Sequence, residues 1–186
     1  MEQRKNMLKN KIRSARGFTL AETLLAVIIL LLAAAIVATG VPAARNAYEK
    51  VVLASNAEIL LSTSMSTLRN ELGMAKSVEV KEDRQTIVFF SEMRKTQSKI
   101  YLNSDDDMPV IKIQRYYKES DKDAEGEWLV TQEASTANLY VTYREAAISE
   151  NGEYITFTDL SVMRRSVGGG SELVKRDRFS VRLFSE

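Results

Sequence analysis

Carboxylates at two places in the sequence have the type and spacing to do chemistry. Glu22 stands directly before Thr23 to Ala44, a stretch without any charged residue. Asp121, Asp123 and Glu125 place oxygen side chains at alternate positions, as in the first half of a calcium-binding loop. A carboxylate in an apolar segment is penalised unless a cation pairs with it, so Glu22 predicts a charged partner. The second group predicts part of a metal ligand set.

The calcium interpretation of the second group is incomplete. Gly126 follows at the sixth position, but Gln132 occupies the twelfth, where such a loop needs a bidentate Glu. A strand is also predicted where the second helix of a calcium site should begin. We therefore predict an acidic hairpin loop here, and a turn at Asp105 to Asp107. No cofactor is expected, and calcium on the three carboxylates is the alternative.

The composition removes most enzyme chemistry. The 186-residue chain contains no Cys and no His, so it has no thiolate nucleophile, disulfide, Ser-His-Asp triad or imidazole ligand for zinc. Gly168-Gly169-Gly170 lacks the Lys and the Ser or Thr of a phosphate-binding loop, and is predicted to be a flexible loop before the last strand. We expect a protein that is not an enzyme, with paired-carboxylate catalysis left open.

Charge distribution and hydropathy together predict one membrane crossing. Thr23 to Ala44 is 22 residues long, and a helix of that length at ~1.5 Å per residue spans a hydrocarbon core of ~30 Å. Residues 1–16 hold six basic side chains and one acidic one, a net of +5, against −4 for the rest. Basic residues stay on the cytoplasmic side, so the rest of the chain is predicted to lie outside. A nucleic-acid-binding arm is the rival interpretation, but it lacks interleaved aromatic residues.

Two kinds of targeting segment fit this pattern. An ordinary secretory signal is cut after its apolar stretch, and Val41-Pro42-Ala43 is an acceptable site that would leave a new terminus at Ala44. However, such signals have an apolar stretch of only ~7–15 residues. A carboxylate beside the bilayer, such as Glu22, is also energetically unfavourable, and a signal that is removed does not need one. Because the cleavage site is acceptable, a monomeric binding domain, secreted or membrane-anchored, stays open as the alternative function.

The residues around Glu22 carry a family resemblance. Arg16-Gly17-Phe18-Thr19-Leu20-Ala21-Glu22-Thr23-Leu24-Leu25 resembles the processing motif of type IV prepilins and of the pseudopilins of type II secretion and competence systems. The resemblance implies that a prepilin peptidase cuts between Gly17 and Phe18 on the cytoplasmic side, and that Phe18 is then N-methylated. It also implies that Glu22 meets the terminal amine of a neighbouring subunit and sets the register of a filament.

A cut at this position has physical consequences. Because it precedes the apolar stretch, the mature 169 of the 186 residues keep the helix and carry a free amine beside the bilayer. That amine and Glu22 have opposite charges, and a low dielectric strengthens their attraction. Gly40 and Pro42 predict a kink or a melted turn near the outer end of the helix, because Gly weakens a helix and Pro removes a backbone donor.

The pattern beyond the membrane predicts an α+β fold. The helix continues to Gly73, which is well placed to end it. A stripe of apolar residues with 4-3-4 spacing is predicted to face a core, and it consists of Leu61, Met65, Leu68 and Leu72. After Ser77 the apolar residues alternate, and no strand-helix-strand repeat appears, so the head is predicted to be an antiparallel sheet with a hairpin turn at Asn151-Gly152. The predicted strands are Val78–Lys81, Thr86–Met93, Lys99–Leu102, Val110–Tyr117, Trp128–Thr131, Leu139–Tyr143, Tyr154–Leu160 and Phe179–Phe184.

With the resemblance, the chain divides into four parts. These are a cleaved basic leader (1–17), a transmembrane and filament-core helix (18–44), its amphipathic continuation (45–73) and an extracytoplasmic β head (74–186). We expect a structural subunit of a type IV pilus-like filament or of a type II secretion or competence pseudopilus. The implied partners are the membrane, a prepilin peptidase, an assembly platform protein and other pilin or pseudopilin subunits, with no sequence signal for nucleic acid. The implied location is the cytoplasmic membrane, and then a filament at the cell surface or outside the cell.

Overall fold

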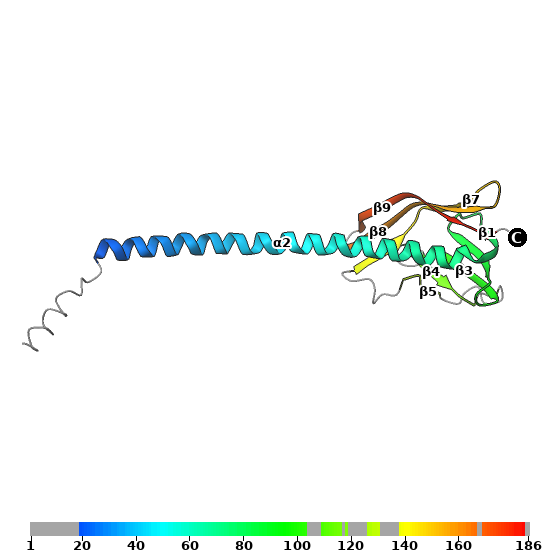
Figure 1. Ribbon diagram of the computed structural model, residues 1–186, viewed down its shortest axis with the longest axis horizontal. Helices are drawn as coiled ribbons and strands as arrows, with labels where there is room; N and C mark the ends of the chain where they lie inside the picture. Colours follow the sequence, from blue (N-terminus) through cyan, green and yellow to red (C-terminus); the bar gives the residue numbers. More distant parts are fainter. Residues whose placement is uncertain are drawn as a thin grey trace, which may run out of the picture. The chain divides into compact units, whose positions relative to one another are not determined.

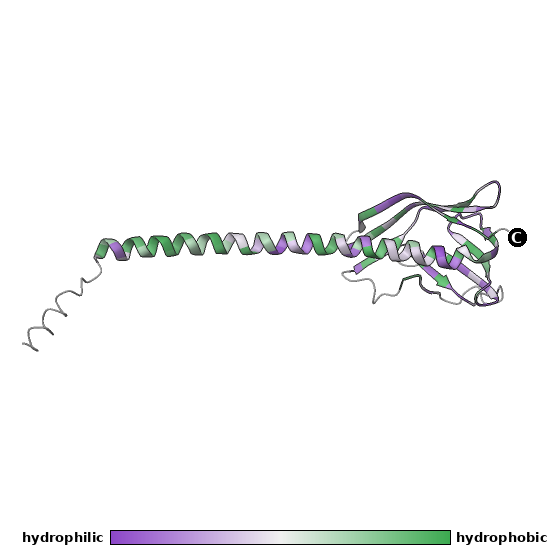
Figure 2. Ribbon diagram, viewed as in Figure 1, coloured by the Kyte–Doolittle hydropathy of each residue, from purple (hydrophilic) through white to green (hydrophobic). Residues whose placement is uncertain are grey.

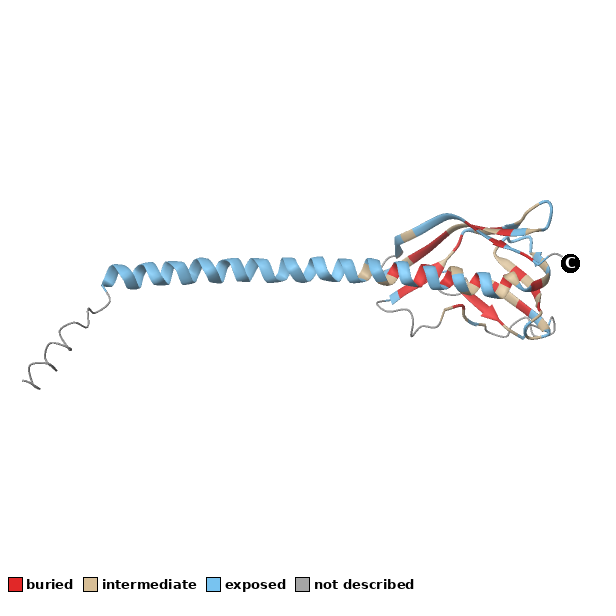
Figure 3. Cartoon of the chain, viewed as in Figure 1, coloured by how far each residue is buried: buried red, intermediate tan, exposed pale blue. Residues whose placement is uncertain are grey.

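The computed structural model describes residues 19–103, 109–116, 118, 126–130, 138–166 and 169–184. The chain forms two compact units, Met1–Glu49 and Lys50–Glu186. All the buried residues of the described ranges lie in the second unit (Figure 3). From here on we call this whole unit the head, so that it includes the second part of the long helix as well as the predicted β region 74–186. The head therefore has a hydrophobic core of its own.

Helix α2 extends from Leu20 to Gly73 and contributes residues to both units (Figure 1). The sequence predicted these limits to within two residues, because the helical pattern continues from the apolar stretch into the amphipathic stretch in spite of Gly40 and Pro42. Among the described residues α2 is the sole α-helix, and every strand pairs in antiparallel fashion. The α+β prediction is confirmed.

The backbone stays helical through the predicted weak point of α2. Gly40 and Pro42 both lie within the helix. One turn earlier, the Thr39 hydroxyl donates to the carbonyl oxygens of Ala35 (3.1 Å) and Ile36 (3.3 Å). A Thr hydroxyl bonded back to its own helix is often found where a helix bends. The turn is therefore not melted in the single chain, and the predicted kink stays a prediction.

The first sheet of the head follows the chain order. Its five strands lie side by side in the order β1-β2-β3-β4-β5. The strands are β1 (Ala75–Val80), β2 (Thr86–Ser91), β3 (Thr96–Asn103), β4 (Val110–Gln114) and β5 (Glu127–Trp128). Burial alternates along β2 and β3, as expected for strands with one face on a core.

The second sheet is built around β8. Its strands are β6 (Leu139–Thr142), β7 (Glu145–Ile148), β8 (Tyr154–Ser166) and β9 (Gly169–Arg182). Both β6 and β7 pair with β8, and β9 pairs with β8 along nearly its whole length. Between β7 and β8 lies the predicted hairpin turn, where Gly152 has a φ of +71°.

Two predictions for the second sheet were wrong. The sequence placed a flexible loop at residues 168–170, but Gly169 and Gly170 belong to β9 and pair with Ser166 and Arg165 of β8. Strand β7 was not predicted, because Ala and Glu have low β propensity. Both errors have the same cause: the long strand β8 supplies the hydrogen-bond partners that the local sequence does not suggest.

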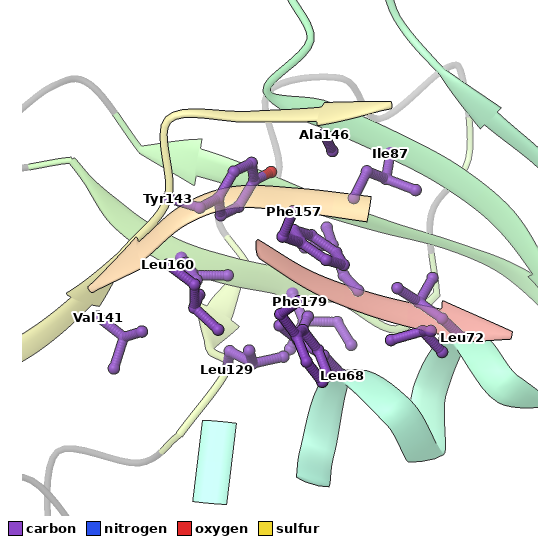
Figure 4. Close-up of a cluster of buried hydrophobic side chains, with 14 of the residues drawn as sticks. Leu68, Leu72, Ile87, Leu129, Val141, Tyr143, Ala146, Phe157, Leu160 and Phe179 are labelled. Atoms are coloured by element: carbon purple, nitrogen blue, oxygen red, sulfur yellow. The ribbon is translucent and has the colours of Figure 1, made fainter. Parts of the chain in front are cut away.

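The core of the head lies between the second half of α2 and the two sheets. Figure 4 shows Leu68 and Leu72 of α2 close to Phe179, with Phe157 next to it. The rings of Phe157 and Phe179 stack at a centroid distance of 6.1 Å. The fully buried side chains of α2 confirm the predicted stripe, with Met65 half-buried beside it; they are Ala57, Leu60, Leu61, Ser64, Leu68 and Leu72. Each buried Leu or Phe side chain stabilises the head by roughly 1.5–3 kcal/mol.

The turn between β1 and β2 joins the two sheets. The Ala146 N–H of β7 donates to the Arg84 carbonyl (2.7 Å), and the Tyr143 hydroxyl donates to the Gln85 carbonyl (2.7 Å). Burial raises the pKa of Tyr143, so its hydroxyl remains a donor. These bonds fix the register between turn and strand, although the residues are about 60 positions apart in the chain.

Asp83 holds this turn in shape. Its carboxylate accepts hydrogen bonds from the Thr86 hydroxyl (2.7 Å) and from the backbone N–H groups of Gln85 and Thr86 (both 2.9 Å). Partial burial alone would raise the pKa of Asp83, but these hydrogen bonds outweigh it, and the pKa is lowered. The charged form of Asp83 therefore stabilises the joint between the sheets.

Candidate functional site

Glu22 lies in the first turn of α2, where it forms a capping box with Thr19. The Thr19 N–H and the Thr19 hydroxyl both donate to Glu22 Oε2, at 2.9 and 3.0 Å. In return, the Glu22 N–H donates to the Thr19 hydroxyl oxygen at 3.3 Å. Two of the free N–H groups at the helix start are thereby satisfied, which explains why α2 begins at Leu20.

Thr19 was not among the predicted site residues. The signal was present, because Thr and Glu three residues apart before an apolar run are typical of a capping box. In the single chain, Glu22 is therefore not an unpaired carboxylate: Oε2 is occupied by Thr19. Among the described residues, no donor reaches the second oxygen, Oε1. That oxygen is the atom of Glu22 that is open to a further cation.

The helix after Glu22 presents apolar side chains on all sides. From Leu20 to Val41, its large aliphatic side chains are 45–84% exposed. Figure 2 colours this part of α2 almost entirely hydrophobic, and Figure 3 shows it exposed throughout. It is the one helix of the described chain that is long and apolar enough to cross a membrane, and none of its most apolar window is buried. An apolar surface of this kind requires lipid or another apolar helix as its neighbour.

Several residues that the sequence singled out lie outside the described residues. They are Gly17, Phe18, Asp121, Asp123, Glu125 and the run Asp105 to Asp107. The processing site and the calcium alternative therefore stay predictions. Within the described ranges, no group of three or more Asp, Glu, His or Cys side chains is placed to hold a metal ion. Of the predicted site, the structure describes Glu22 at the helix start, and Gly40 and Pro42 further along α2.

A charged cluster at the other end of α2 was not foreseen. The side chain of Glu71, in the last turn of α2, is only 13% exposed. It pairs with Arg94 of the turn after β2, and its Oε1 lies 3.6 Å from Nε of Arg115 after β4. Arg115 in turn pairs with Glu127 of β5. This ion cluster fixes the last turn of α2 to the first sheet.

Two hollows of the head contain no paired carboxylates. One is lined mainly by apolar residues, including Leu60, Trp128 and Val141, and its Ser64 hydroxyl donates to the Leu60 carbonyl (2.8 Å). The other lies beside Gly73 and the end of β9. Neither arrangement suggests acid–base chemistry.

Comparison of the chain with protein-family models, with curated proteins and with solved structures finds no match. The architecture is pilin-like: a long N-terminal helix, apolar in its first half, packs its second half on antiparallel sheets. For a more specific function, the informative features are the motif around Glu22 and the exposed apolar part of α2, which needs lipid or another apolar helix as its neighbour.

Proposed function

We propose that this protein is a structural subunit, a pilin or pseudopilin, of a type IV pilus-like filament or of a type II secretion or competence pseudopilus. One observation carries the proposal. A single uninterrupted helix supplies both a fully exposed apolar stretch and the central element of the head core. A membrane anchor needs only the first property, whereas a filament subunit needs both, because the head must stay attached when the helix leaves the lipid.

Cohesion in such a filament would come from the helix. The apolar segment, Thr23 to Ala44, can leave lipid only for an environment that is equally apolar. Bundled copies of the same segment provide that environment, and their contacts would be van der Waals packing between helices. The heads would then form the outer surface. The protein would act by assembling, and we propose no catalytic step.

Glu22 would define the position of each helix in the bundle. Cleavage after Gly17 creates a positive amine on Phe18, one residue before the cap residue Thr19. A cation at the N-terminus of a helix is unfavourable, because the helix dipole is positive there. A carboxylate whose Oε1 remains open can accept this amine from a neighbouring copy, and an unpaired charge at any other register would be penalised.

The proposed partners and location follow from the charge pattern. The basic leader keeps the N-terminus in the cytoplasm, so the prepilin peptidase would act on that side and the head would lie outside. An assembly platform protein would then move the processed chain from the membrane into a filament at the cell surface. Other pilin or pseudopilin subunits would be its neighbours there.

The secretory-signal alternative meets a structural difficulty. A cut before Ala44 falls inside α2, where the backbone is helical on both sides. Proteases act most readily on exposed loops, whose backbone is not held in regular hydrogen bonds. This observation favours retention of the apolar segment over its removal.

The mass and N-terminus of the mature protein distinguish the two functions. The full chain would be expressed with and without a prepilin peptidase, and the membrane fraction analysed by intact mass and terminal sequencing. We expect a chain of 169 residues that begins with N-methylated Phe18 and appears only with the peptidase. A terminus at Ala44, or an unprocessed chain, would contradict the proposal.

Replacement of Glu22 tests the assembly role separately from processing. Glu22→Ala is expected to insert and to be processed, but to reduce the assembled fraction by about tenfold or more, which corresponds to ~1.4 kcal/mol. Glu49→Ala is the matched control, because Glu49 is also an exposed helical carboxylate and forms a surface ion pair with Arg45. Normal incorporation of Glu22→Ala into filaments would remove the charge-pairing argument.

A further inference from the structure

Strand β9 is the outer strand of the second sheet, and among the described residues one of its two edges has no partner (Figure 1). All its pairs are with β8, from Arg182 opposite Tyr154 to Gly169 opposite Ser166. In the described part of the chain, no backbone hydrogen bond joins β9 to any other element. Its 14 residues correspond to roughly 45 Å of free edge, and such an edge is a template for a further strand.

The hairpin of β8 and β9 is positively charged, although the head as a whole is negative. Residues 160–184 hold six basic and two acidic residues, a net of +4, whereas the other residues of the head, 50–159 and 185–186, hold 13 basic and 20 acidic ones, a net of −7. Two carboxylates of the sheet, Asp159 and Asp177, are both paired with Lys175. Arg178 and Arg182 have no ion pair with any described residue. They are therefore available to carboxylates of a partner.

The two arginines lie on the outward side of β9. Both are exposed, and they alternate along the strand with the buried residues Phe179, Val181 and Leu183. Four residues of a strand span about 13 Å. A strand added to the free edge would place a residue opposite each arginine, with the Cβ atoms about 5 Å apart. Carboxylates at two positions four residues apart would then form charge-assisted hydrogen bonds with the arginines.

The free edge ends at a hollow between α2 and β9. The second half of α2 runs beside the strand, since Cζ of Arg69 lies 5.7 Å from the ring centroid of Phe179. One turn later lies a hollow of about 380 Å³, and none of its described lining residues comes from β8. The lining consists of Gly73, Arg182, Leu183 and Phe184. Phe184 is 71% exposed, so the hollow offers an apolar wall to a large apolar side chain of a partner.

We propose that the free edge of β9 binds an extended acidic segment of another protein as an additional antiparallel strand. Main-chain hydrogen bonds to a sheet edge supply affinity in this binding mode, and side-chain sites supply specificity. Here the side-chain sites are Arg178 and Arg182 for two carboxylates, and the hollow beside Gly73 for one apolar residue. The inference goes beyond the proposed function, because assembly through the N-terminal helix does not require it.

Other occupants fit the free edge less well. A second copy that paired its own β9 here would bring two rows of cations together, and like charges opposite one another are unfavourable. A nucleic acid or an anionic membrane would satisfy the arginines. However, it would leave the carbonyl groups of the edge and the apolar hollow without partners.

Peptide binding tests the proposed side-chain sites. The full chain in detergent micelles would be titrated into the fluorescent peptide Thr-Phe-Glu-Thr-Thr-Thr-Glu-Thr, and the anisotropy measured. Paired antiparallel to β9, this peptide places Phe at the hollow and its two Glu opposite Arg182 and Arg178. We expect saturable binding, and none for the peptide with both Glu replaced by Lys. Equal binding of the two peptides would overturn the inference.

Variants of the protein localise the contact. Arg178→Ala and Arg182→Ala should each weaken binding of the acidic peptide by about tenfold, since each removes a charge-assisted hydrogen bond. Arg164→Ala is the matched control: it removes the same charge from an exposed site of the same sheet, and we expect less than a twofold effect. Unchanged thermal unfolding would show that each variant is folded. Equal losses for Arg178→Ala and Arg164→Ala, or no loss for Arg178→Ala, would overturn the inference.

Backbone methylation tests strand pairing separately from charge. Residues of a strand direct their N–H groups alternately to its two edges, and only one edge of the peptide would face β9. The acidic peptide would be N-methylated at every second residue, in both frames. We expect one frame to abolish binding and the other to retain it. Equal binding in both frames would overturn the inference, as would a DNA duplex or anionic lipid vesicles that bind through Arg178 while the peptide does not bind. None of these measurements needs a filament, so their failure would leave the proposed function standing.

Discussion

Removal of the Glu71 carboxylate should weaken the attachment of α2 to the first sheet. Glu71 has two cationic partners, Arg94 and Arg115, and its side chain is 13% exposed. The Arg94 side chain is 16% exposed, and its Nε is already buried without a hydrogen-bond partner. Glu71→Ala would leave this guanidinium buried and unpaired. Breaking a buried ion pair in this way costs about 3–5 kcal/mol. Because some water reaches both side chains, we expect a loss of about 3 kcal/mol.

The assay is urea unfolding of the full chain in detergent micelles, followed by tryptophan fluorescence. The chain has one Trp, Trp128, which lies in β5 next to Glu127 of the same ion cluster. Its signal therefore reports the head and this cluster in particular. Glu58→Ala is the control, as an exposed carboxylate on the same helix; surface changes of that type usually stay within about 0.5 kcal/mol.

A double-mutant cycle identifies the cause of the loss. If the ion pair is responsible, Glu71→Ala combined with Arg94→Ala should cost clearly less than the two single changes together, because the second removes the unpaired charge left by the first. Additive effects would mean that Glu71 acts through packing alone. A loss for Glu71→Ala no larger than that for Glu58→Ala would refute the ion-cluster argument.

Three further changes probe the head. Gly170→Ala should destabilise it by about 1–3 kcal/mol in thermal unfolding, because a Cβ there would collide with the hydroxyl of a neighbouring tyrosine, whereas Gly73→Ala has open space and should be near neutral. Tyr143→Phe should cost about 1 kcal/mol, measured in urea, since it removes one buried hydrogen bond. The lowered pKa of Asp83 adds stability at pH values above the unfolded value of about 3.9, and this stability is lost as the pH falls through the lower folded pKa. Asp83→Asn should therefore be less stable at neutral pH and show a flatter dependence below about pH 5, and an unchanged pH profile would contradict this.

The sequence was most informative where the pattern is local. The 22 residues without charge and the 4-3-4 stripe predicted α2 nearly to its ends, because helix formation and amphipathic burial both depend on residues within a few turns. Strand β2 and the second half of β3 were also predicted, since every second residue is a large apolar one that faces the core: Ile87 and Phe89 in β2, and Ile100 and Leu102 in β3. The fold class could therefore be derived without any structure.

The remaining features depend on partners that are distant in the sequence. The sequence predicted one antiparallel sheet, whereas the head has two. Apolar residues alternate along a strand in the same way whether the strands form one sheet or two, so the alternation does not show which strands pair. Strand β9 begins ten residues before its predicted start at Phe179, because its polar and Gly-rich first half is held by pairing with β8. The ion pair of Glu71 could not be predicted, since its partner Arg94 is 23 positions away. The sequence predicted Glu22 as a site residue, but not that Thr19 is its hydrogen-bond partner in the single chain.

Strand β9 follows all the other described elements in the chain, and the head cannot be completed before β9 has been made. During synthesis, the stripe of α2 emerges first, but Phe179, Val181 and Leu183, which help to bury it, come last. Contacts between segments this far apart form slowly, because a long loop must close before they contribute. If the residues after the apolar segment cross the membrane in the order of their synthesis, the core of the head therefore stays open until β9 has been exported. A chain that ends before β9 leaves β8 without its longest partner, and we expect such a product to be degraded or to aggregate before it reaches a filament.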